Sequence, residues 1–579
     1  MVTSGSASSE HLTSLRFLVT TEALTAGDDV EAGHAWRRAS DDRQARRSAD
    51  ATSGATPPLR SRWRTQKVGV LAIGLFLAAA KQANSDDAGP LLSQFEDGGV
   101  LTSLGDAARS SRQAVPQAPE LVWTASPSIA VAPGGSDANP GTTALPLATL
   151  QRAIDLAKPG DTVLLRKGVY EVTKAIHVVG MAATASQPLT VIGETGAVLR
   201  VNAEGVPGVW RGIFEITNSS FVIVKNLTVE NSSFFGFRVQ DSSDIVLQGN
   251  TSSISLGSGI HAGRVSRLRV INNDVSRFCD RNKFGADPKT GCQEGITISG
   301  VDDFVVKGNR VHDAPQSEGV GPGGGEGIDI KAGSKNGVVA FNSVWNLVQI
   351  GIYVDGYSQG VSNVQVFGNR VWNTYMGIVV SSEAGGMVSD LAIHNNIVYN
   401  VGTDGIQVSN FKSTSEGDGP RRRISIYNNT VVNAGIKEAK PEFCALWSLT
   451  PLADSGTGIK IATENVAEMA IFDNIVSGSK SFAIELPATV QATARVETNL
   501  IWPATDPDAK KYNPNAYDGT KAIVAPPLFV SEAAFNWHLN PSSPAIGAGS
   551  GGVRLDRDAD KVRRPSSPIE LGALVLTRG

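Results

Sequence analysis

Cysteine and long apolar runs are scarce in this chain of 579 residues, and each scarcity excludes a class of protein. With three cysteines and seven scattered histidines, a zinc site is not expected. Beyond residue 85, no apolar stretch is long enough to cross a bilayer, which excludes a membrane domain apart from an N-terminal anchor. An excess of charge of one sign is also missing, since the formal net charge is −4. Without a basic field, nucleic acid is not expected as a main partner.

Glycine is frequent, at 61 residues, and it marks one half of a degenerate repeat. That half reads Gly-apolar-x-apolar at residues 236–239, 259–262, 295–298, 327–330, 351–354, 377–380, 405–408 and 458–461. The other half reads apolar-x-apolar-x-x-Asn-x-Val, with small variations, at residues 221–229, 244–250, 304–311, 338–344, 364–371 and 391–398. Each half predicts a short strand with period-two alternation. Because one repeat cannot bury its own apolar face, the repeats are expected to stack into a solenoid.

The first 120 residues carry no such repeat. Residues 1–59 are polar and aperiodic, so we interpret them as a disordered leader. Residues 60–85 hold a basic segment, a short apolar core (VGVLAIGLFLAAA) and small residues, which predict a signal peptide or an uncleaved anchor; a buried core helix is the alternative. Residues 86–120 form a linker. The protein is therefore expected to be secreted or periplasmic, where Cys279 and Cys292 could form a disulfide or remain thiols, with Cys444 left over.

Residues 137–170 predict a helix followed by a strand. Thr149 is the expected N-cap, and Pro159 with Gly160 ends the helix. Such a helix would cover the open end of the solenoid. On this segment and the coils after it, the chain resembles secreted right-handed parallel β-helix proteins of the pectate-lyase-like superfamily. The resemblance implies an all-β, right-handed single-stranded parallel β-helix over 121–500 with an N-terminal capping helix, a closing segment over 501–579, and a monomer.

In that superfamily each coil has three strands, and an asparagine at one corner stacks on its equivalents in neighbouring coils. Such a ladder would serve structure, because a buried amide needs partners and the next coil supplies them. The resemblance assigns this ladder to Asn226, Asn250, Asn273, Asn309, Asn342, Asn369, Asn396 and Asn429.

If the apolar residues of the Gly-apolar-x-apolar strands point inward, the alternate residues form two outward columns. The first column is Arg238, His261, Thr297, Asp329, Tyr353, Val379 and Gln407. The second column is Gln240, Gly263, Ser299, Lys331, Asp355, Ser381 and Ser409. With coils ~4.8 Å apart, Lys331 should lie beside Asp355 and near Asp329. Long loops at 279–294 and 313–326 should wall this patch.

One chemistry for this patch is β-elimination on a uronic-acid polymer, in which a base removes a proton next to the sugar carboxylate. The strand from Glu326 to Lys331 resembles the Glu-x-Ile-x-x-Lys strand of the chondroitinase B and alginate lyase family, and also a strand of β-helical pectate lyases. The resemblance implies Lys331 as the base and Glu326 as a calcium ligand, and we add Glu294 and Asp329 as further ligands. The chain departs from the first family in having Asp355 where that family has arginine, and from the second in having Gln293 and Glu294 where paired aspartates stand.

Other interpretations remain open. Asp329 and Asp355 on a diagonal of ~8 Å suit an inverting glycoside hydrolase, and C5-epimerisation starts with the same proton abstraction as elimination. A non-catalytic carbohydrate-binding or adhesive solenoid has the same fold, and outward polar residues can simply be solvated salt bridges. For an acidic polysaccharide we assign catalysis to Lys331, Asp355 and Asp329. Substrate contacts are assigned to Arg238, His261, Tyr353, Tyr357 and Glu383.

Overall fold

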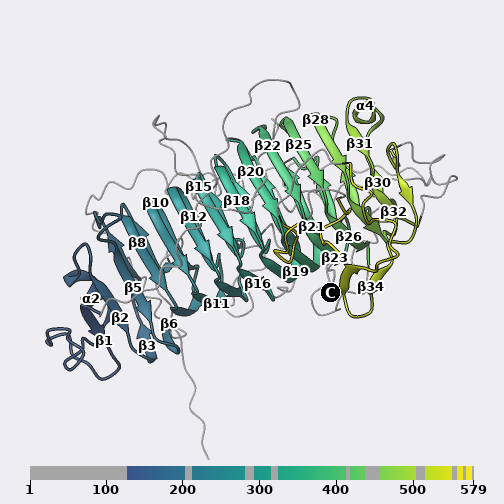
Figure 1. Cartoon of the computed structure of the whole chain (residues 1–579). Coiled ribbons are helices and arrows are strands. Elements are labelled where there is room, and N and C mark those ends of the chain that lie inside the picture. The colour runs from purple at the N-terminus through teal and green to yellow at the C-terminus, as the bar shows by residue number, and fades with distance from the viewer. Residues whose placement is uncertain are drawn as a thin grey trace, which may run out of the picture. The chain divides into compact units, whose positions relative to one another are not determined.

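The computed structural model describes residues 127–201, 212–280, 292–314, 324–412, 417–436, 456–503, 515–550, 557–564 and 569–576. Within them the chain forms coil after coil of short strands, and each strand pairs in parallel with its equivalent in the next coil (Figure 1). This confirms the predicted parallel β-helix. The leader over 1–59, the export signal over 60–85, the linker over 86–120 and Cys444 lie outside the described residues.

The first of three parallel sheets contains the Gly-apolar-x-apolar strands. Its strands are β4 (Ile176–Val179), β7 (Gly212–Thr217), the first part of β10 (Phe235–Gln248) and of β12 (Ile260–Ile271), β14 (Ile296–Ser299), β17 (Ile328–Lys331), the last part of β19 (Ser343–Asp355) and of β21 (Arg370–Ser381), β24 (Ile406–Val408), β27 (Ile459–Ile461) and β30 (Ile484–Glu485).

The second sheet follows the first in each coil. It contains β1 (Ile129–Val131), β2 (Thr162–Leu165), β5 (Leu189–Gly193), β8 (Ser220–Lys225), the last parts of β10 and β12, β15 (Asp302–Lys307), β18 (Lys335–Ala340), β20 (Val361–Phe367), β22 (Val388–His394), β25 (Arg421–Tyr427), β28 (Val466–Phe472) and β31 (Arg495–Glu497).

The third sheet begins after the asparagine corner. It contains β3 (Gly168–Val172), β6 (Ala197–Val201), β9 (Thr228–Ser232), β11 (Thr251–Ser255), β13 (Asp274–Ser276), β16 (Arg310–His312), the first parts of β19 and β21, β23 (Ile397–Val401), β26 (Thr430–Ala434), β29 (Ile475–Ser477), β32 (Leu500–Trp502) and β33 (Ile523–Val524).

The core lies between the three sheets and contains the inward apolar residues of every coil. In β17, for example, Ile328 and Ile330 are fully buried among the core side chains. Their partners one coil away, Ile352 and Val354, are equally buried. Burial of one apolar column after another is the main stabilising term, since each buried aliphatic side chain contributes about 1.5–3 kcal/mol.

The asparagine ladder is present and differs from the prediction at both ends, because it lacks Asn226 and continues to Asn474 and Asn499. Each Asn Nδ2 donates to Oδ1 of the next Asn at 2.9–3.1 Å, in the series Asn250, Asn273, Asn309, Asn342, Asn369, Asn396, Asn429, Asn474 and Asn499. Asn226 is not part of it. Asn226 takes the left-handed corner conformation with φ 54°, and Leu227 occupies the ladder position, buried in the core. The prediction placed Asn226 one residue out of register.

A capping helix covers the start of the coils, as predicted. Helix α2 (Leu150–Leu156) begins after Thr149, whose side chain accepts a hydrogen bond from the Arg152 amide. Leu150, Ala153 and Ile154 join the core. No helix among the described residues is long and apolar enough to cross a membrane.

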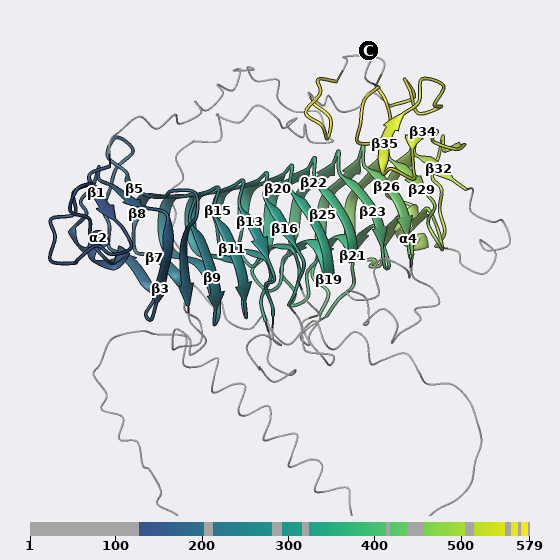
Figure 2. The same ribbon diagram turned by 90° about the horizontal axis from the view of Figure 1, so that it is seen from below.

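The C-terminal closing segment packs along the coils rather than only across their end. It contains the antiparallel pair β34 (Phe529–Ser531) and β35 (Asn536–Leu539), after the short helix α4 (Ala488–Gln491). The closing segment lies alongside the later coils (Figure 2). Two contacts hold it there: Arg370 pairs with Asp560 at 2.7 Å, and Arg564 donates to the Asn395 side chain at 3.0 Å.

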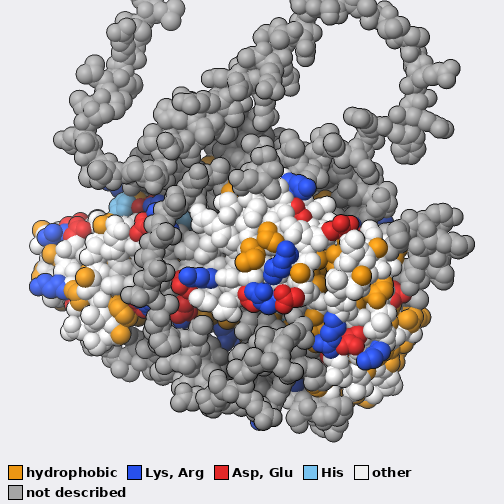
Figure 3. Space-filling view, turned by 90° about the horizontal axis from the view of Figure 1, so that it is seen from above, with side chains coloured by type: hydrophobic (Ala, Val, Ile, Leu, Met, Phe, Trp, Pro, Cys, Tyr) orange, Lys and Arg blue, Asp and Glu red, His pale blue; other side chains and the backbone are white. Residues whose placement is uncertain are grey.

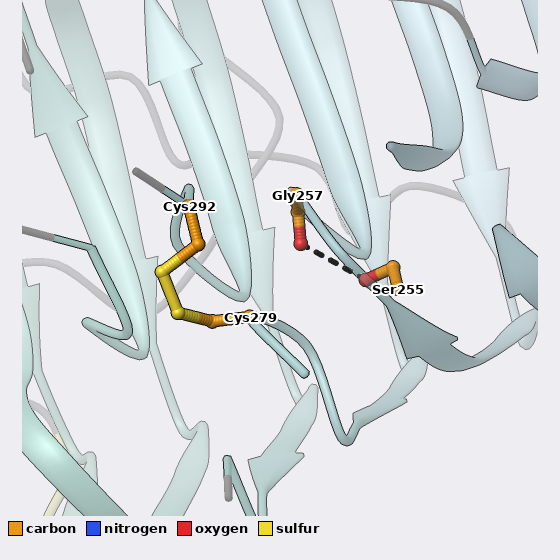
Figure 4. Close-up of a disulfide and its surroundings, with 4 residues drawn as sticks. All are labelled: Ser255, Gly257, Cys279 and Cys292. Carbon is orange, nitrogen blue, oxygen red and sulfur yellow. Dashed lines mark hydrogen bonds between the residues drawn. A yellow bond between two sulfur atoms is a disulfide. The ribbon is translucent and has the colours of Figure 1, made fainter. Parts of the chain in front are cut away.

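Cys279 and Cys292 form a disulfide (Figure 4). It is anchored by the preceding coil, because the Cys279 amide donates to the Gly257 carbonyl at 3.4 Å. Gly324 approaches so closely that a Cβ there would lie 2.7 Å from the Cys292 sulfur. The bridge therefore fixes the chain just before Glu294. The glycines that pack against the bridge directly precede Glu326 in the sequence.

Candidate functional site

The two outward columns lie in the predicted register. Asp329 is paired with Tyr353, and Lys331 with Asp355, on the adjacent strands β17 and β19. Thr297 and Ser299 of β14 are the partners of Asp329 and Lys331 on the other side. The period-two alternation of each strand thus brings the predicted catalytic residues Lys331, Asp329 and Asp355 together on two successive coils.

Lys331 lies at the centre of this cluster. Its Nζ is 2.5 Å from Glu294 Oε1 and 3.0 Å from Asp329 Oδ2. The second oxygen of Glu294 accepts a 2.5 Å hydrogen bond from the Thr297 hydroxyl, which is in turn 2.7 Å from Ser258 Oγ. Glu294 is therefore held on both oxygens by neighbouring side chains.

The cluster is closed to solvent, which corrects the expectation of a solvent-facing patch. Lys331 is 5% exposed, Asp329 1% and Asp355 0%. These side chains point away from the apolar core, but they lie on adjacent coils ~4.8 Å apart and cover one another. A sugar must therefore displace part of this cover to reach Lys331.

Four carboxylates of this cluster carry a buried oxygen without a hydrogen-bond partner. These atoms are Glu326 Oε2, Asp329 Oδ1, Asp355 Oδ2 and Glu383 Oε2. A buried polar atom without a partner costs about 1–3 kcal/mol. Four such atoms around one lysine indicate a site built to receive protons or a polar ligand.

The pKa shifts of Lys331 and Glu294 both favour the charged form of the side chain, unlike those of the other acids in the cluster. Burial opposes charge on both, but the ammonium of Lys331, with hydrogen bonds from Lys331 and Thr297, outweighs burial and keeps the pKa of Glu294 below its usual value. The carboxylates of Asp329 and Glu294 likewise outweigh burial and raise the pKa of Lys331. The two residues form a charged pair, with Lys331 held as an ammonium.

The pKa values of the remaining acids are all raised, so these acids hold their protons to higher pH than usual. Burial, with a smaller contribution from Glu294, raises the pKa of Glu326 to about 7. Burial also raises the pKa of Asp355 to about 6, and burial with the Asp355 charge raises that of Glu383 to about 8. The pKa of Asp329 is raised well above its usual value, because burial outweighs the attraction of Lys331.

Tyr353, Tyr357 and Glu383 lie in or beside the cluster, where the prediction placed them. The Tyr353 hydroxyl donates to Glu383 Oε1. The Tyr357 amide donates to Asp355 Oδ1 at 2.9 Å. Burial and the Glu383 carboxylate raise the pKa of Tyr353, so its hydroxyl keeps its proton.

Arg238 and His261 lie earlier along the same outward column. Three pairings separate Arg238 from Asp329, a span of ~14 Å. Arg238 is 3.9 Å from Glu215, while His261 stacks on Phe235 with ring centroids 4.5 Å apart. Burial and the nearby Arg238 charge lower the pKa of His261 to about 3, so it is neutral. Arg238 is therefore placed for a different sugar unit from the one at Lys331, whereas His261 lies two pairings from Asp329 and within electrostatic range of Glu294 and Lys331.

The predicted calcium ligands match calcium in chemistry but not in placement. Glu326 and Asp329 each offer a buried oxygen without a partner, and carboxylate oxygens are the ligands that Ca²⁺ prefers. Glu294, however, is engaged by Lys331 and Thr297. Among the described residues, no group of three or more His, Cys, Asp or Glu side chains is arranged to hold a metal ion. We therefore derive no step through calcium.

Sequence reasoning missed Ser258, which completes the hydrogen-bonded chain Ser258–Thr297–Glu294–Lys331. Ser258 directly precedes Gly259, the position that Glu294 and Glu326 take before their own strand glycines. Extending that position to every coil would have found it. The parts of the predicted loops at 281–291 and 315–323 lie outside the described residues.

Residues 129–300 match the family model described as "Pel9A-like, right handed beta helix region". The match supplies the handedness of the coils over these residues, and with the parallel pairing it confirms the predicted right-handed parallel β-helix. It ends before β17, so Lys331 lies outside the matched residues.

This chain is similar, among others, to two proteins and one solved structure. The uncharacterized protein YwoF of Bacillus subtilis is 23% identical over 475 residues, covering 72% of this chain and 91% of YwoF. Pectate lyase PEL9 of Emericella nidulans is 31% identical over 190 residues, covering 30% of this chain and 46% of PEL9. The crystal structure of pectate lyase Pel9A is 14% identical with a TM-score of 0.42, covering 77% of this chain and 96% of Pel9A. A TM-score of this size does not support a shared activity.

Proposed function

We propose that the protein is an exported enzyme that cleaves a uronic-acid-containing polysaccharide by β-elimination, with Lys331 as the base. The observation that carries this proposal is the buried contact of Lys331 with Glu294 and Asp329 on the outer side of the first sheet. Similarity to a pectate lyase over 190 residues supports the substrate class.

Lys331 must lose its proton before it can act as a base. The 2.5 Å hydrogen bond to Glu294 gives the proton a direct route. A sugar that covers the cluster excludes water, and exclusion of water weakens a charged pair relative to its neutral form. Proton transfer from Lys331 to Glu294 then leaves a neutral amine facing the sugar.

The neutral acids of the cluster suit the other requirement, which is stabilisation of the substrate carboxylate. Glu383 keeps its proton at neutral pH and Glu326 is partly protonated there, because burial raises their pKa values to about 8 and about 7. A neutral carboxylic acid can donate a hydrogen bond to a sugar carboxylate as negative charge develops next to it. Lys331 removes the C5 proton, the C4–O bond breaks and a C4–C5 double bond forms. The leaving oxygen takes a proton from the hydrogen-bonded pair of Tyr353 and Glu383.

Glycoside hydrolysis is a second candidate, favoured by the opposite pKa shifts of two neighbouring acids. The pKa of Glu294 is lowered and that of Glu326 is raised to about 7, which is the pattern of a base beside an acid. The pair Asp329 and Asp355 fits less well, because both pKa values are raised and neither acid is set apart as the base.

The test is incubation with pectate, alginate and glycosaminoglycans, with and without a chelator. New ultraviolet absorbance from an unsaturated uronate supports elimination, and reducing ends without that absorbance support hydrolysis. Retention on a polysaccharide column without either product indicates a binding solenoid. Loss of activity with the chelator, restored by Ca²⁺, would support the calcium prediction.

Lys331→Arg separates the base role from the charge, since arginine keeps the cation but does not give up a proton. We expect Lys331→Arg to lose elimination as completely as Lys331→Ala does. The matched control is Lys460→Ala, because Lys460 is on the same sheet, in the outward column that contains Asp329, and pairs with Glu485 at 3.4 Å. An active Lys331→Arg would overturn the base assignment.

We also propose that the protein works outside the cytoplasm, as a monomer. The export sequence at 60–85 and the Cys279–Cys292 disulfide support an oxidising compartment. Sequencing the N-terminus of protein recovered from the culture medium or periplasm tests this; recovery only from the cytoplasm contradicts it.

A further inference from the structure

A cleft lies at the corner between the second and third sheets, against the closing segment. It has a volume of about 290 Å³ and is lined by Phe341, Asn342, Ser343, Gly368, Arg370, Ala559, Asp560 and Lys561. Lys331 lies on the first sheet, so this cleft is separate from the cluster around it.

Phe341 has an unusual conformation for its residue type. Its φ is 54°, in the left-handed region, where the equivalent corner residues of the neighbouring coils are Gly308 and Gly368. The left-handed conformation costs a residue with a Cβ roughly 1–2 kcal/mol. The half-buried Phe341 ring lies over Gly368, where an added Cβ would meet the ring at 2.6 Å. Strain at an aromatic residue that lines a cleft points to a function for the ring.

The Phe341 ring gathers positive charge. Lys561 Nζ is 5.0 Å and Lys307 Nζ 5.6 Å from its centroid, within the range of cation–π attraction. Arg370 lines the same cleft, paired with Asp560, which is also 3.0 Å from His538. Three cations therefore lie in or beside this cleft, and one carboxylate is among its lining residues. On the face in Figure 3, lysine or arginine side chains lie next to acidic ones at several places.

We propose that this cleft binds an anionic sugar, a uronate unit of the polymer that the proposed function assigns to the Lys331 cluster. Its volume is close to that of small ligand sites, and its lining combines an aromatic ring with a hydroxyl, an amide and cations. The ammonium groups of Lys561 and Lys307 would bind the sugar carboxylate, with Phe341 fixing their positions. A second site on one chain would hold a long polymer while the Lys331 cluster acts on another part of it.

The experiment measures retention of the full chain on immobilised polygalacturonate and alginate, with xylan as the neutral reference. Every variant carries Lys331→Ala, so that the polymer is not consumed. Phe341→Gly and Lys561→Ala are each expected to lower retention about fivefold or more, which corresponds to about 1 kcal/mol. Glycine accepts the φ of Phe341, and Lys561 is exposed, so both variants should fold. A thermal unfolding midpoint checks this.

The control is Arg423→Ala, an exposed cation paired with Asp390 at 2.6 Å on another part of the second sheet, which should leave retention unchanged. Unchanged retention in both cleft variants would overturn the proposal, and so would complete loss of retention in Lys331→Ala alone or the absence of retention in the parent chain. If Lys331→Ala still eliminates, the proposed function fails instead, and the cleft variants still decide this inference.

Discussion

Thr297 donates its hydroxyl proton to the one oxygen of Glu294 that Lys331 does not use, at 2.5 Å. The two residues are three positions apart, at the start of β14, so the strand geometry fixes the contact. The hydrogen bond helps to keep the pKa of Glu294 low, and it sets how readily Glu294 takes a proton from Lys331.

Thr297→Val removes this hydrogen bond while keeping the side-chain shape. The pKa of Glu294 should then rise, because a bond to its charged form is lost. We expect the acid limb of the pH–rate profile for elimination to move to higher pH. Thr190→Val, at a buried threonine on β5, is the matched control and should leave the profile in place. A Thr297→Val profile that superimposes on the parent profile would contradict the role of Glu294.

The raised pKa values of the cluster acids predict a dependence of stability on pH. An acid with a higher pKa in the folded than in the unfolded state binds more protons when folded, so its contribution to stability is complete below its unfolded pKa and is lost as pH rises through its folded pKa. For Glu383 the window runs from about 4.5 to about 8. We therefore expect the thermal unfolding midpoint of the parent chain to decrease as the pH is raised from 5 to 8.5.

Glu383→Gln is the test of that dependence, because glutamine can still accept the bond from Tyr353 but does not titrate. Its midpoint should fall less over the same pH range. An equal fall in both chains would show that other groups cause the pH dependence.

Removal of a ladder asparagine should destabilise the coils strongly. Asn369→Ala removes the side-chain oxygen that accepts from the backbone and side-chain N–H groups of Asn342, and it removes one of the two donors to Asn396 Oδ1, all of them buried. We expect a loss of about 2–4 kcal/mol, since buried groups without partners cost about 1–3 kcal/mol each. Urea unfolding followed by circular dichroism measures it. Asn363→Gly, at an exposed asparagine of β20 whose φ of 53° glycine accepts, should cost less than about 0.5 kcal/mol; equal losses would refute the structural role of the ladder.

Reduction of the Cys279–Cys292 disulfide should lower both stability and activity. The bridged residues are 13 positions apart, and closing a loop of that size stabilises a fold by about 3 kcal/mol. Cys292 is two residues from Glu294, so release of the bridge also frees the chain that places this acid. The measurements are the thermal midpoint and elimination rate of Cys279→Ser, with Cys444→Ser as the control. A fully active Cys279→Ser would show that the disulfide does not contribute to the activity of the site.

The fold could be predicted from sequence because its two signals are local. The alternation around residues such as Ile328 and Ile330 fixes which face is buried, and one residue of slip would turn that face outward. The columns containing Lys331, Asp329 and Asp355 followed from the same alternation. Asn226 shows the limit, because Asn also favours the left-handed corner one residue earlier, and sequence alone does not separate the two positions.

The closure of the site and its pairing could not be predicted in the same way. Burial of Lys331 depends on side chains from several coils, and its contact with Glu294 spans 37 residues. The Phe341 cleft joins a coil corner to Asp560 and Lys561, more than two hundred residues away, and no repeat links them. Contacts of this kind come from tertiary packing, which period-two patterns do not encode.

The asparagine ladder runs in one direction only. In every step the N-terminal coil donates and the C-terminal coil accepts, so each newly formed coil ends in amide hydrogens whose acceptor has not yet been synthesised or exported. Each completed coil thus offers hydrogen-bond donors to the coil that follows it. A truncated chain leaves the donors of its last corner available to bind a carbonyl group of another molecule. Assembly of the solenoid is in this sense vectorial, and truncated chains should be the ones that self-associate.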